Sequence, residues 1–413
     1  MLKPDRYKRI MARIESYRQQ MIDLQVSLTA IPALAPENGG NGETEKAQFL
    51  LDFLAANGFE NVSVINAPDE RVSSGVRPNI IVRMPGIRAR TVWIVTHTDV
   101  VPPGELSLWT HEPYAAIIRD GKIYGRGTED NQQDLVASLF AAKAFIDEKI
   151  IPASAVGLAF VADEETSSAL GMHYILQQKN LIFRPHDYIV VSDFGNPEGS
   201  LIEISEKSIL WIRCKTSGVQ CHASTPGEGK NAFAAASQFV VSLRGLYRTF
   251  DRGDSFFHPA TSTFEPTKKE SNVPNINTIP GEDIFYLDCR VLPAYDAGAV
   301  LTEIRSVADG IEREFGVTIE IIPVQYFQAP SPTSKDAPVV RALSEAVRSV
   351  YGIETRPAGI GGGTVASPLR HRGYEAAVWS RLNETAHRPD ENCLIDNMLG
   401  NAKVYAHLFL HED

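Results

Sequence analysis

Cysteine is scarce in this sequence and follows no disulfide or metal-binding spacing. Four cysteines occur among 413 residues, and no two of them form a C-x-x-C pair. A disulfide-stabilised extracellular fold would carry more cysteines in a shorter chain. The scarcity therefore predicts a reducing compartment for all four: Cys214, Cys221, Cys289 and Cys393.

Long apolar runs and an excess of basic residues are also missing. No stretch reaches the ~20 apolar residues that a membrane-spanning helix needs, and the charged N-terminal residues 1–9 do not resemble a secretory signal. The formal net charge is −11 at pH 7, whereas nucleic acids and anionic membranes attract basic surfaces. These absences predict a cytoplasmic protein with neither nucleic acid nor membrane as its partner.

The composition that remains is that of a folded protein with two domains. Hydrophobic residues make up 43% and charged residues 22% of the chain, which excludes a disordered protein. A length of 413 residues exceeds one ordinary domain.

Short apolar segments alternate with helical stretches through the first half of the chain. The segments are continuously apolar, as in parallel strands covered by helices on both faces, and they span residues 79–82, 92–95, 156–161 and 188–191. Helical periodicity marks residues 6–31, 48–57 and 135–148. The alternation predicts an α/β fold with a mostly parallel sheet flanked by helices.

The pattern changes near Lys207 to a compact α+β unit. Strands are expected over residues 209–216, 261–264, 284–290 and 318–323, and helices over 231–247 and 299–315. Residues 324–330 read as a return linker, after which helices over 341–351 and 397–410 and a strand over 376–380 resume the first pattern. We therefore predict a first domain in two parts, residues 1–206 and 324–413, with residues 207–323 inserted as a second domain.

Metal-binding and proton-transferring side chains follow several of the predicted strands. In open parallel sheets, functional residues gather at the carboxyl ends of the strands. His97 and Asp99 lie two residues apart, so their side chains point to one face of an extended segment. A carboxylate often holds the second nitrogen of a metal-binding histidine, although a plain hydrogen-bonded pair has the same spacing.

Further carboxylates are expected at the same edge of the sheet. Glu164 and Glu165 repel each other unless a cation or a shared proton compensates, and an exposed acidic loop is the alternative. Asp130 could bridge two metal ions ~3.5–4 Å apart, or it could cap the helix that follows. Asp193 and His387 have similar alternatives, a solvated turn carboxylate and a surface histidine.

Together these motifs resemble those of the co-catalytic zinc peptidases and deacylases. That family includes succinyl-diaminopimelate desuccinylase, acetylornithine deacetylase, aminoacylase, carboxypeptidase G and carnosinase-type dipeptidases. The motifs occur in order along nearly the whole chain: His97-Thr-Asp99, Gly125-Arg-Gly-Thr-Glu-Asp130, Asp163-Glu164-Glu165, Asp193 and Glu384-Thr-Ala-His387.

The resemblance implies two divalent metal ions per subunit. Asp130 would bridge them, His97 and Asp193 would complete one site, and Glu165 and His387 would complete the other. Imidazole and carboxylate ligands suit zinc, and also cobalt or manganese.

The resemblance also implies the groups that act beside the metals. Glu164 would be the general base that activates the attacking water, and Asp99 would orient His97. The peptide bond between Asp130 and Asn131 would be cis.

The predicted inserted domain resembles the family's lid, which also forms a homodimer interface. Residues 217–226 resemble the lid motif, and by that resemblance His222 would reach the partner subunit's site and stabilise the oxyanion. Asn277 and Arg290 match substrate-contacting positions of the family. Without the resemblance, His222 reads as an ordinary surface histidine.

Residues 359–364 form a glycine-rich loop, Gly-Ile-Gly-Gly-Gly-Thr. Backbone N–H groups in such a loop can bind anions. Nucleotide binding is disfavoured because the G-x-G-x-x-G pattern is incomplete and no fitting strand precedes the loop. In the family this loop holds the substrate's carboxylate, which implies substrate contacts at Gly362, Gly363 and Thr364, and a structural turn is the alternative.

These inferences predict a metal-dependent amidohydrolase that deacylates an N-acyl amino acid of the desuccinylase type. Two alternatives stay open. One is a dipeptidase, aminopeptidase or carboxypeptidase that acts on short peptides. This alternative stays open because the family members that have an aspartate at the position of Asp193 include aminopeptidases and dipeptidases. The other is a non-catalytic small-molecule or metal-binding relative.

Overall fold

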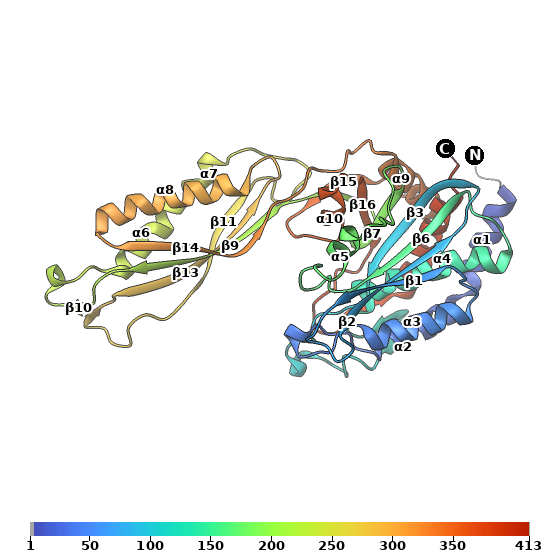
Figure 1. The fold of residues 1–413 in the computed structure, drawn as a ribbon, viewed down its shortest axis with the longest axis horizontal. Coiled ribbons are helices and arrows are strands. Elements are labelled where there is room, and N and C mark those ends of the chain that lie inside the picture. The colour runs from blue at the N-terminus through green and yellow to red at the C-terminus, as the bar shows by residue number, and fades with distance from the viewer. Residues whose placement is uncertain (1–3, 413) are drawn as a thin grey trace. The chain divides into compact units, whose positions relative to one another are not determined.

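The computed structural model describes residues 4–412 and divides into two compact units (Figure 1). Unit 1 comprises the residues up to Ile204, Thr333–Pro357 and the residues from Thr364 onward. Unit 2 comprises Ser205–Pro332 and Ala358–Gly363. The predicted insertion spanned residues 207–323, so unit 2 is longer at both ends and takes in most of the glycine-rich loop.

Unit 1 is built on an eight-stranded sheet in the order β1-β2-β6-β3-β7-β16-β8-β15. Its strands are β1 (Val62–Pro68), β2 (Val76–Met84), β3 (Arg88–His97), β6 (Ser154–Val161), β7 (Tyr188–Asn196), β8 (Leu201–Glu206), β15 (Arg356–Ile360) and β16 (Ala376–Arg381). The central strands β6, β3, β7 and β16 run parallel, which confirms the predicted mostly parallel sheet. Their shared direction brings their carboxyl ends to one rim.

The direction of β2 differs from the prediction. Residues 79–82 were expected in a parallel strand, but β2 pairs antiparallel with β6. The connection from Met84 to Arg88 is too short for a parallel crossover, which needs a dozen residues or more. The chain therefore leaves β2 and enters β3 at the same end of the sheet.

Helices and a small sheet complete unit 1. The helices are α1 (Pro4–Ser16), α2 (Arg18–Thr29), α3 (Thr44–Ala56), α4 (Gln133–Glu148), α5 (Met172–Gln177), α9 (Pro338–Tyr351), α10 (Ala366–His371) and α11 (Ile395–Leu410). The helix predicted over residues 6–31 is thus divided at Tyr17. A three-stranded sheet consists of β4 (Ile117–Arg119), β5 (Lys122–Tyr124) and β17 (Asn392–Leu394). Within residues 4–412, no helix has both the length and the apolarity needed to cross a bilayer.

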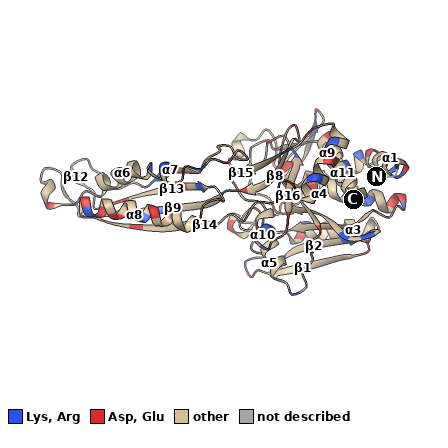
Figure 2. Cartoon of the chain, turned by 90° about the horizontal axis from the view of Figure 1, so that it is seen from above, with Lys and Arg blue, Asp and Glu red and all other residues tan. Residues whose placement is uncertain are grey.

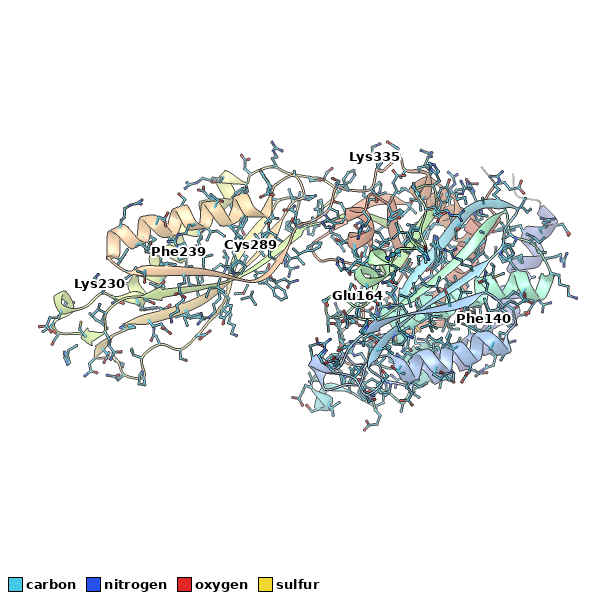
Figure 3. The ribbon with its side chains drawn as sticks, in the orientation of Figure 1. Phe140, Glu164, Lys230, Phe239, Cys289 and Lys335 are labelled. Carbon is cyan, nitrogen blue, oxygen red and sulfur yellow. The ribbon has the colours of Figure 1, made fainter. Side chains whose placement is uncertain are left out.

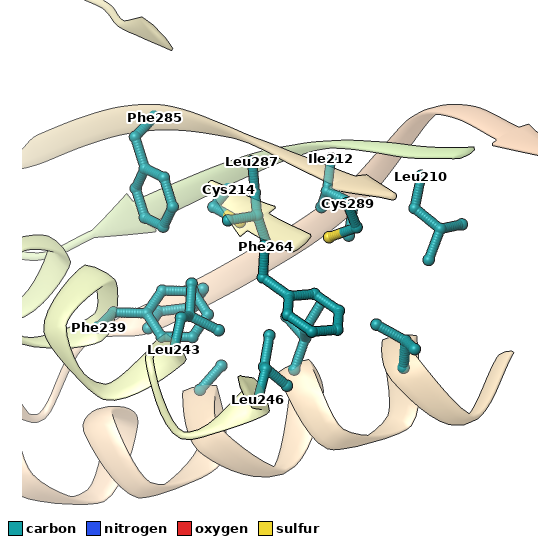
Figure 4. Packing of buried hydrophobic residues seen from close by; sticks show 14 of the residues in the cluster. Leu210, Ile212, Cys214, Phe239, Leu243, Leu246, Phe264, Phe285, Leu287 and Cys289 are labelled. Carbon is teal, nitrogen blue, oxygen red and sulfur yellow. The ribbon is translucent and has the colours of Figure 1, made fainter. Parts of the chain in front are cut away.

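Unit 2 is an antiparallel sheet packed against helices on one face. The sheet has the order β11-β13-β9-β14, and its elements are β9 (Ser208–Ser217), β11 (Thr263–Lys269), β13 (Glu282–Val291), β14 (Thr318–Phe327), α6 (Ala232–Leu243), α7 (Leu246–Thr249) and α8 (Ala297–Phe315). Figure 4 shows the core, where Phe239 and Leu246 meet sheet residues such as Leu287. Both charge signs occur on α8 (Figure 2). Arg305 of this helix pairs with Asp309.

The linker predicted over residues 324–330 is wrong in its first part, because β14 continues to Phe327. The register of β14 against β9 shifts between Pro323 and Gln325. A proline cannot donate to a strand ladder, and a bulge at that point lets the strand continue past it. The proline that suggested a linker therefore marks an irregularity inside a strand.

Acid should destabilise unit 1 through His407 on α11. This side chain is 1% exposed, its Nδ1 has no hydrogen-bond partner among residues 4–412, and its ring packs against Tyr7. Burial lowers the pKa of His407 to about 4. Because an unfolded histidine titrates near 6.5, the folded state binds fewer protons between these values, and stability falls as pH drops from 6.5 to 4.

The loss assigned to His407 is about 3 kcal/mol of unfolding free energy at 1.36 kcal/mol per pKa unit. The free energy of unfolding would be measured by guanidinium denaturation at pH 7 and at pH 4.5. We expect its decrease between these two pH values to be about 2–3 kcal/mol smaller in His407→Leu than in the parent protein. A variant of the exposed His186, His186→Gln, serves as the control. Parallel losses in all three proteins would contradict the assignment.

Candidate metal centre

The predicted metal ligands lie together at the carboxyl rim of the unit 1 sheet. His97 is the last residue of β3, Asp193 lies within β7, and His387 belongs to the loop after β16. Asp130 lies in the turn before α4, and Glu165 follows β6 together with Glu164, which Figure 3 labels. The sequence placed Asp193 beyond its strand, but β7 extends past it to Asn196.

Asp130 lies between the two histidines. Its Oδ1 is 2.9 Å from Nε2 of His97, and its Oδ2 is 3.1 Å from Nε2 of His387. Nε2 of His97 is also 3.4 Å from Oδ1 of Asp193, and Nε2 of His387 is 3.1 Å from Oε2 of Glu165. The side chains therefore form two clusters that share one aspartate. The peptide bond from Asp130 to Asn131 is cis.

The donor atoms fit divalent cations. The ligand atoms of His97, Asp130 and Glu165 lie within 4.8 Å of one another, as do those of His97, Glu164 and Asp193. Within the described part of the chain, Oε1 of Glu165 is buried without a hydrogen-bond partner. A buried carboxylate oxygen in that state calls for a further partner, such as an ion. Imidazole nitrogen and carboxylate oxygen are donors suited to zinc, cobalt or manganese.

The electrostatics of the rim show how closely the carboxylates are crowded. Burial, and after it the negative charge of Asp193, raises the pKa of Glu164 well above its usual range. Burial and Asp130 raise the pKa of Glu165 to about 7. Hydrogen bonds to Asp130 and Glu165 raise the pKa of His387 to about 10. The site thus holds more negative charge than its two imidazoles offset, and cations bound there would be strongly favoured.

Asp99 contacts both sides of this centre. Its Oδ1 is 3.5 Å from Nδ1 of His97, the contact that the sequence predicts. The same carboxylate accepts hydrogen bonds from the backbone N–H groups of Glu164 at 3.1 Å and Glu165 at 2.9 Å. These two bonds were not predicted, because they depend on the course of the loop after β6. Asp99 therefore orients one histidine and also holds the loop of the paired glutamates.

Two buried carboxylates near the centre were missed by the sequence analysis. Glu129 and Glu391 are 1% and 0% exposed, and both accept several backbone N–H groups of neighbouring loops. The only signal in the sequence was that each lies within a few residues of a predicted ligand. That proximity did not separate them from exposed acidic residues.

Most predicted substrate contacts belong to unit 2. His222, Asn277, Arg290, Gly362 and Gly363 lie there, whereas Thr364 begins the last part of unit 1. Strands β10 (Cys221–His222) and β12 (Thr278–Ile279) pair, and the N–H of Ala223 donates to the carbonyl of Asn277. His222 and Asn277 are therefore neighbours. Their roles toward the centre in unit 1 stay predictions.

The tautomer of His222 is set by its neighbour Ser224. The backbone N–H of Ser224 donates to Nδ1 of His222 at 3.1 Å, and the hydroxyl of Ser224 lies 2.7 Å from the same nitrogen. A nitrogen that accepts an N–H carries no proton, so the proton of the neutral ring sits on Nε2. The exposed His222 therefore presents an N–H donor, as an oxyanion contact requires.

The glycine-rich loop has a different setting from the one predicted. No strand was expected before it, but β15 ends at Ile360 and leads directly into it. A guanidinium nitrogen of Arg290 donates to the carbonyl of Gly361 at 2.8 Å. Thr364 is 8% exposed, and its hydroxyl accepts the N–H of Ala366 at the start of α10. Within unit 2, Arg290 and the loop are thus adjacent.

The chain is similar to several known proteins. The profile of Peptidase family M20/M25/M40 matches residues 93–411. An uncharacterized metallohydrolase of Methanococcus maripaludis is 39% identical over 95% of this chain and 99% of its own length. Succinyl-diaminopimelate desuccinylase of Paracoccus denitrificans is 26% identical over 92% of this chain and 95% of its own. The crystal structure of human carnosine dipeptidase 1 superposes with a TM-score of 0.75 at 18% identity and covers 98% of both chains.

Proposed function

This chain belongs to peptidase family M20/M25/M40, and from that premise we propose that it deacylates an N-acyl amino acid with two divalent ions held at the rim of the unit 1 sheet. The family and its relatives make the protein a metal-dependent hydrolase, so the non-catalytic alternative is set aside. The observation that carries the proposal is that Asp130 is shared between two clusters of imidazole and carboxylate groups.

The proposed ligands divide between two metal positions. His97 and Asp193, whose side chains lie together, would hold the first, Glu165 and His387 would hold the second, and Asp130 would serve both. Divalent ions bound there supply Lewis acidity and lower the pKa of water to about 7. Zinc is the proposed metal, with cobalt and manganese as the alternatives that the same ligands suit.

Glu164 is the proposed general base. Its carboxylate lies within 4.8 Å of the ligand atoms of His97 and Asp193, and Asp99 holds its backbone N–H. A base must be within reach of the proton that it takes. Glu164 would accept a proton from the attacking water and return it to the nitrogen of the leaving amine.

The choice of substrate rests on the proposed carboxylate contacts. Arg290 is held by Asp288 through Nε at 2.8 Å and lies against the glycine-rich loop. A guanidinium and backbone N–H groups are donors that suit the carboxylate of an amino acid. The relative named as a desuccinylase supports deacylation, whereas the fold of a carnosine dipeptidase keeps short peptides as the second candidate.

A substrate panel tests the proposal directly. The zinc-, cobalt- and manganese-loaded proteins would be assayed against N-succinyl and N-acetyl amino acids, dipeptides and tripeptides by release of free amine. We expect the largest kcat/KM for an N-acyl amino acid with a free carboxylate. A higher value for a dipeptide would favour the second candidate, and no hydrolysis of any amide would contradict both.

His222 is expected to affect turnover and not metal content. His222→Ala should lower kcat by about 10²–10³-fold, the usual effect of losing one oxyanion donor. Ser224→Ala should have a smaller effect in the same direction, because it removes only the hydroxyl contact to Nδ1. Metal content would be measured on each variant. Unchanged turnover in His222→Ala would contradict the proposed role.

The proposal includes a cytoplasmic homodimer formed through unit 2. His222 would then act on the partner subunit's centre, as the resemblance implies. Mixing Glu164→Gln and His222→Ala subunits should restore one working centre in each mixed dimer. Mixtures no more active than the separate variants would contradict action between subunits.

A further inference from the structure

Glu129 and Glu391 link two loops that carry proposed metal ligands. Glu129 lies in the loop of Asp130, and Glu391 lies in the loop of His387. Among residues 4–412, Nε2 of His97 lies next to Asp130 and Asp193, and Nε2 of His387 lies next to Asp130 and Glu165. Glu129 and Glu391 are therefore not among the proposed ligands. Both side chains are buried, so each needs a full set of hydrogen-bond donors.

Glu391 accepts hydrogen bonds from the loop of Asp130. Its Oε1 accepts the backbone N–H of Glu129 at 2.9 Å and of Asp130 at 3.0 Å. Its Oε2 accepts the backbone N–H of Gly127 at 3.1 Å and a guanidinium N–H of Arg126 at 2.6 Å. One carboxylate thus accepts three backbone N–H groups within residues 127–130, up to the shared aspartate.

Glu129 accepts hydrogen bonds from the loop of His387. Its Oε2 accepts the N–H of Ala386 at 2.9 Å and the hydroxyl of Thr385 at 2.8 Å, together with the N–H of Thr385. Its Oε1 accepts the N–H of Asn383. The residue that precedes the shared aspartate therefore fixes the residues that precede His387.

The loop of His387 needs such support because of its backbone. Glu384, His387 and Asp390 have φ of 61°, 63° and 55°, in the left-handed region that residues other than glycine rarely adopt. Such conformations cost of order 1–3 kcal/mol each and persist where the surroundings determine them. The N–H groups of Asn383, Thr385 and Ala386 in this loop donate to the buried carboxylate of Glu129, and these hydrogen bonds supply that determination.

We propose that Glu129 and Glu391 position the metal ligands reciprocally. Glu391 fixes the loop that carries Glu129 and Asp130, and Glu129 fixes the loop that carries Glu391 and His387. Glu391 sets Asp130, which both metal positions share, and Glu129 sets His387, which serves one position alone. This inference rests on the proposed metal roles of Asp130 and His387. It predicts that the two glutamates differ in which metal position they affect.

The test is a cobalt titration of the full chain, followed by visible absorption and calorimetry. Glu165→Gln identifies the binding step that belongs to the position of Glu165 and His387. We expect Glu129→Gln to weaken that step by about 10–100-fold and to leave the other within about threefold, whereas Glu391→Gln should weaken both steps. Glutamine keeps the shape of the side chain but places an NH₂ group against backbone N–H donors.

Asp187→Asn is the matched control. Asp187 is a 7% exposed carboxylate that accepts the N–H groups of Thr91 and Arg184 and the indole N–H of Trp93, near the start of β7. It should lower thermal stability without changing either binding step. If Glu129→Gln fails to fold, Thr385→Val removes one bond to Glu129 and should weaken the same step by several-fold.

Three outcomes would overturn the positioning role. They are glutamate variants that bind cobalt like Asp187→Asn, a Glu129→Gln that weakens both steps equally, and a loss of binding that follows the loss of thermal stability across all variants. The proposed function fails separately if the parent protein binds fewer than two cobalt ions or hydrolyses no amide. Hydrolysis by the parent protein with unaltered binding in the variants would therefore reject the pair and keep the function.

Discussion

Replacing Glu164 with glutamine is expected to lower kcat by about 10³- to 10⁴-fold while the protein still binds its metals. General bases contribute up to about 10⁴-fold, which is about 5 kcal/mol of transition-state stabilisation at 1.36 kcal/mol per factor of ten. Glutamine has nearly the same size and cannot accept the proton. Glu164 is not among the proposed ligands, so the metal content should stay at the parent value.

The controls separate loss of the base from loss of the site. Glu165→Gln should lower metal content as well as kcat, because Glu165 is a proposed ligand. Glu60→Gln, at an exposed position, should change neither quantity. The measurements are steady-state kinetics on the best substrate of the panel and metal analysis of each protein. A Glu164→Gln variant that retained a tenth or more of the activity would contradict the general-base assignment.

Removal of the metals is expected to abolish turnover and to lower the thermal midpoint. Asp130, Glu164, Glu165 and Asp193 crowd one rim, and burial already raises the pKa of Glu164 and Glu165. An ion present at 1,000 times its Kd stabilises the folded state by about 4 kcal/mol. At about 2–4 °C per kcal/mol for a domain of this size, one site alone should raise the midpoint by about 10 °C.

The experiment is dialysis against a chelator, followed by calorimetry and assay before and after addition of zinc, cobalt or manganese. Both activity and midpoint should return with the metal. Asp130→Ala should resemble the metal-free protein in midpoint and should not respond to added metal. Full activity after chelation would contradict a metal centre at this rim. So would a thermal midpoint of the parent protein that does not change when metal is removed or added.

Local patterns in the sequence were enough for the class of fold and for the contact between His97 and Asp99. Apolar segments of four to six residues predicted the parallel strands β3, β6 and β7, because burial on both faces leaves that signature in the strand itself. The spacing of His97 and Asp99 predicted their contact, since alternate residues of an extended segment share a face. These inferences need no information from distant parts of the chain.

Predictions that depended on distant parts of the chain were less successful. The direction of β2, the continuation of β14 past Pro323 and the strand before the glycine-rich loop were all missed. In each case a pairing with another strand decides the outcome. A proline or a short apolar segment does not determine which strand lies beside it.

What the sequence alone determined is which acids and imidazoles are present, in what order they occur, and which apolar segments form the central strands. The tertiary structure decided that the two oxygens of Asp130 face different histidines, and that Glu129 and Glu391 each accept backbone N–H groups from the loop that carries the other. The reason is that a buried carboxylate takes its donors from whichever backbone lies within about 3 Å. That neighbour is brought there by the pairing of β17 with β5 and by residues with left-handed backbone such as His387, and not by the residues adjacent in the chain.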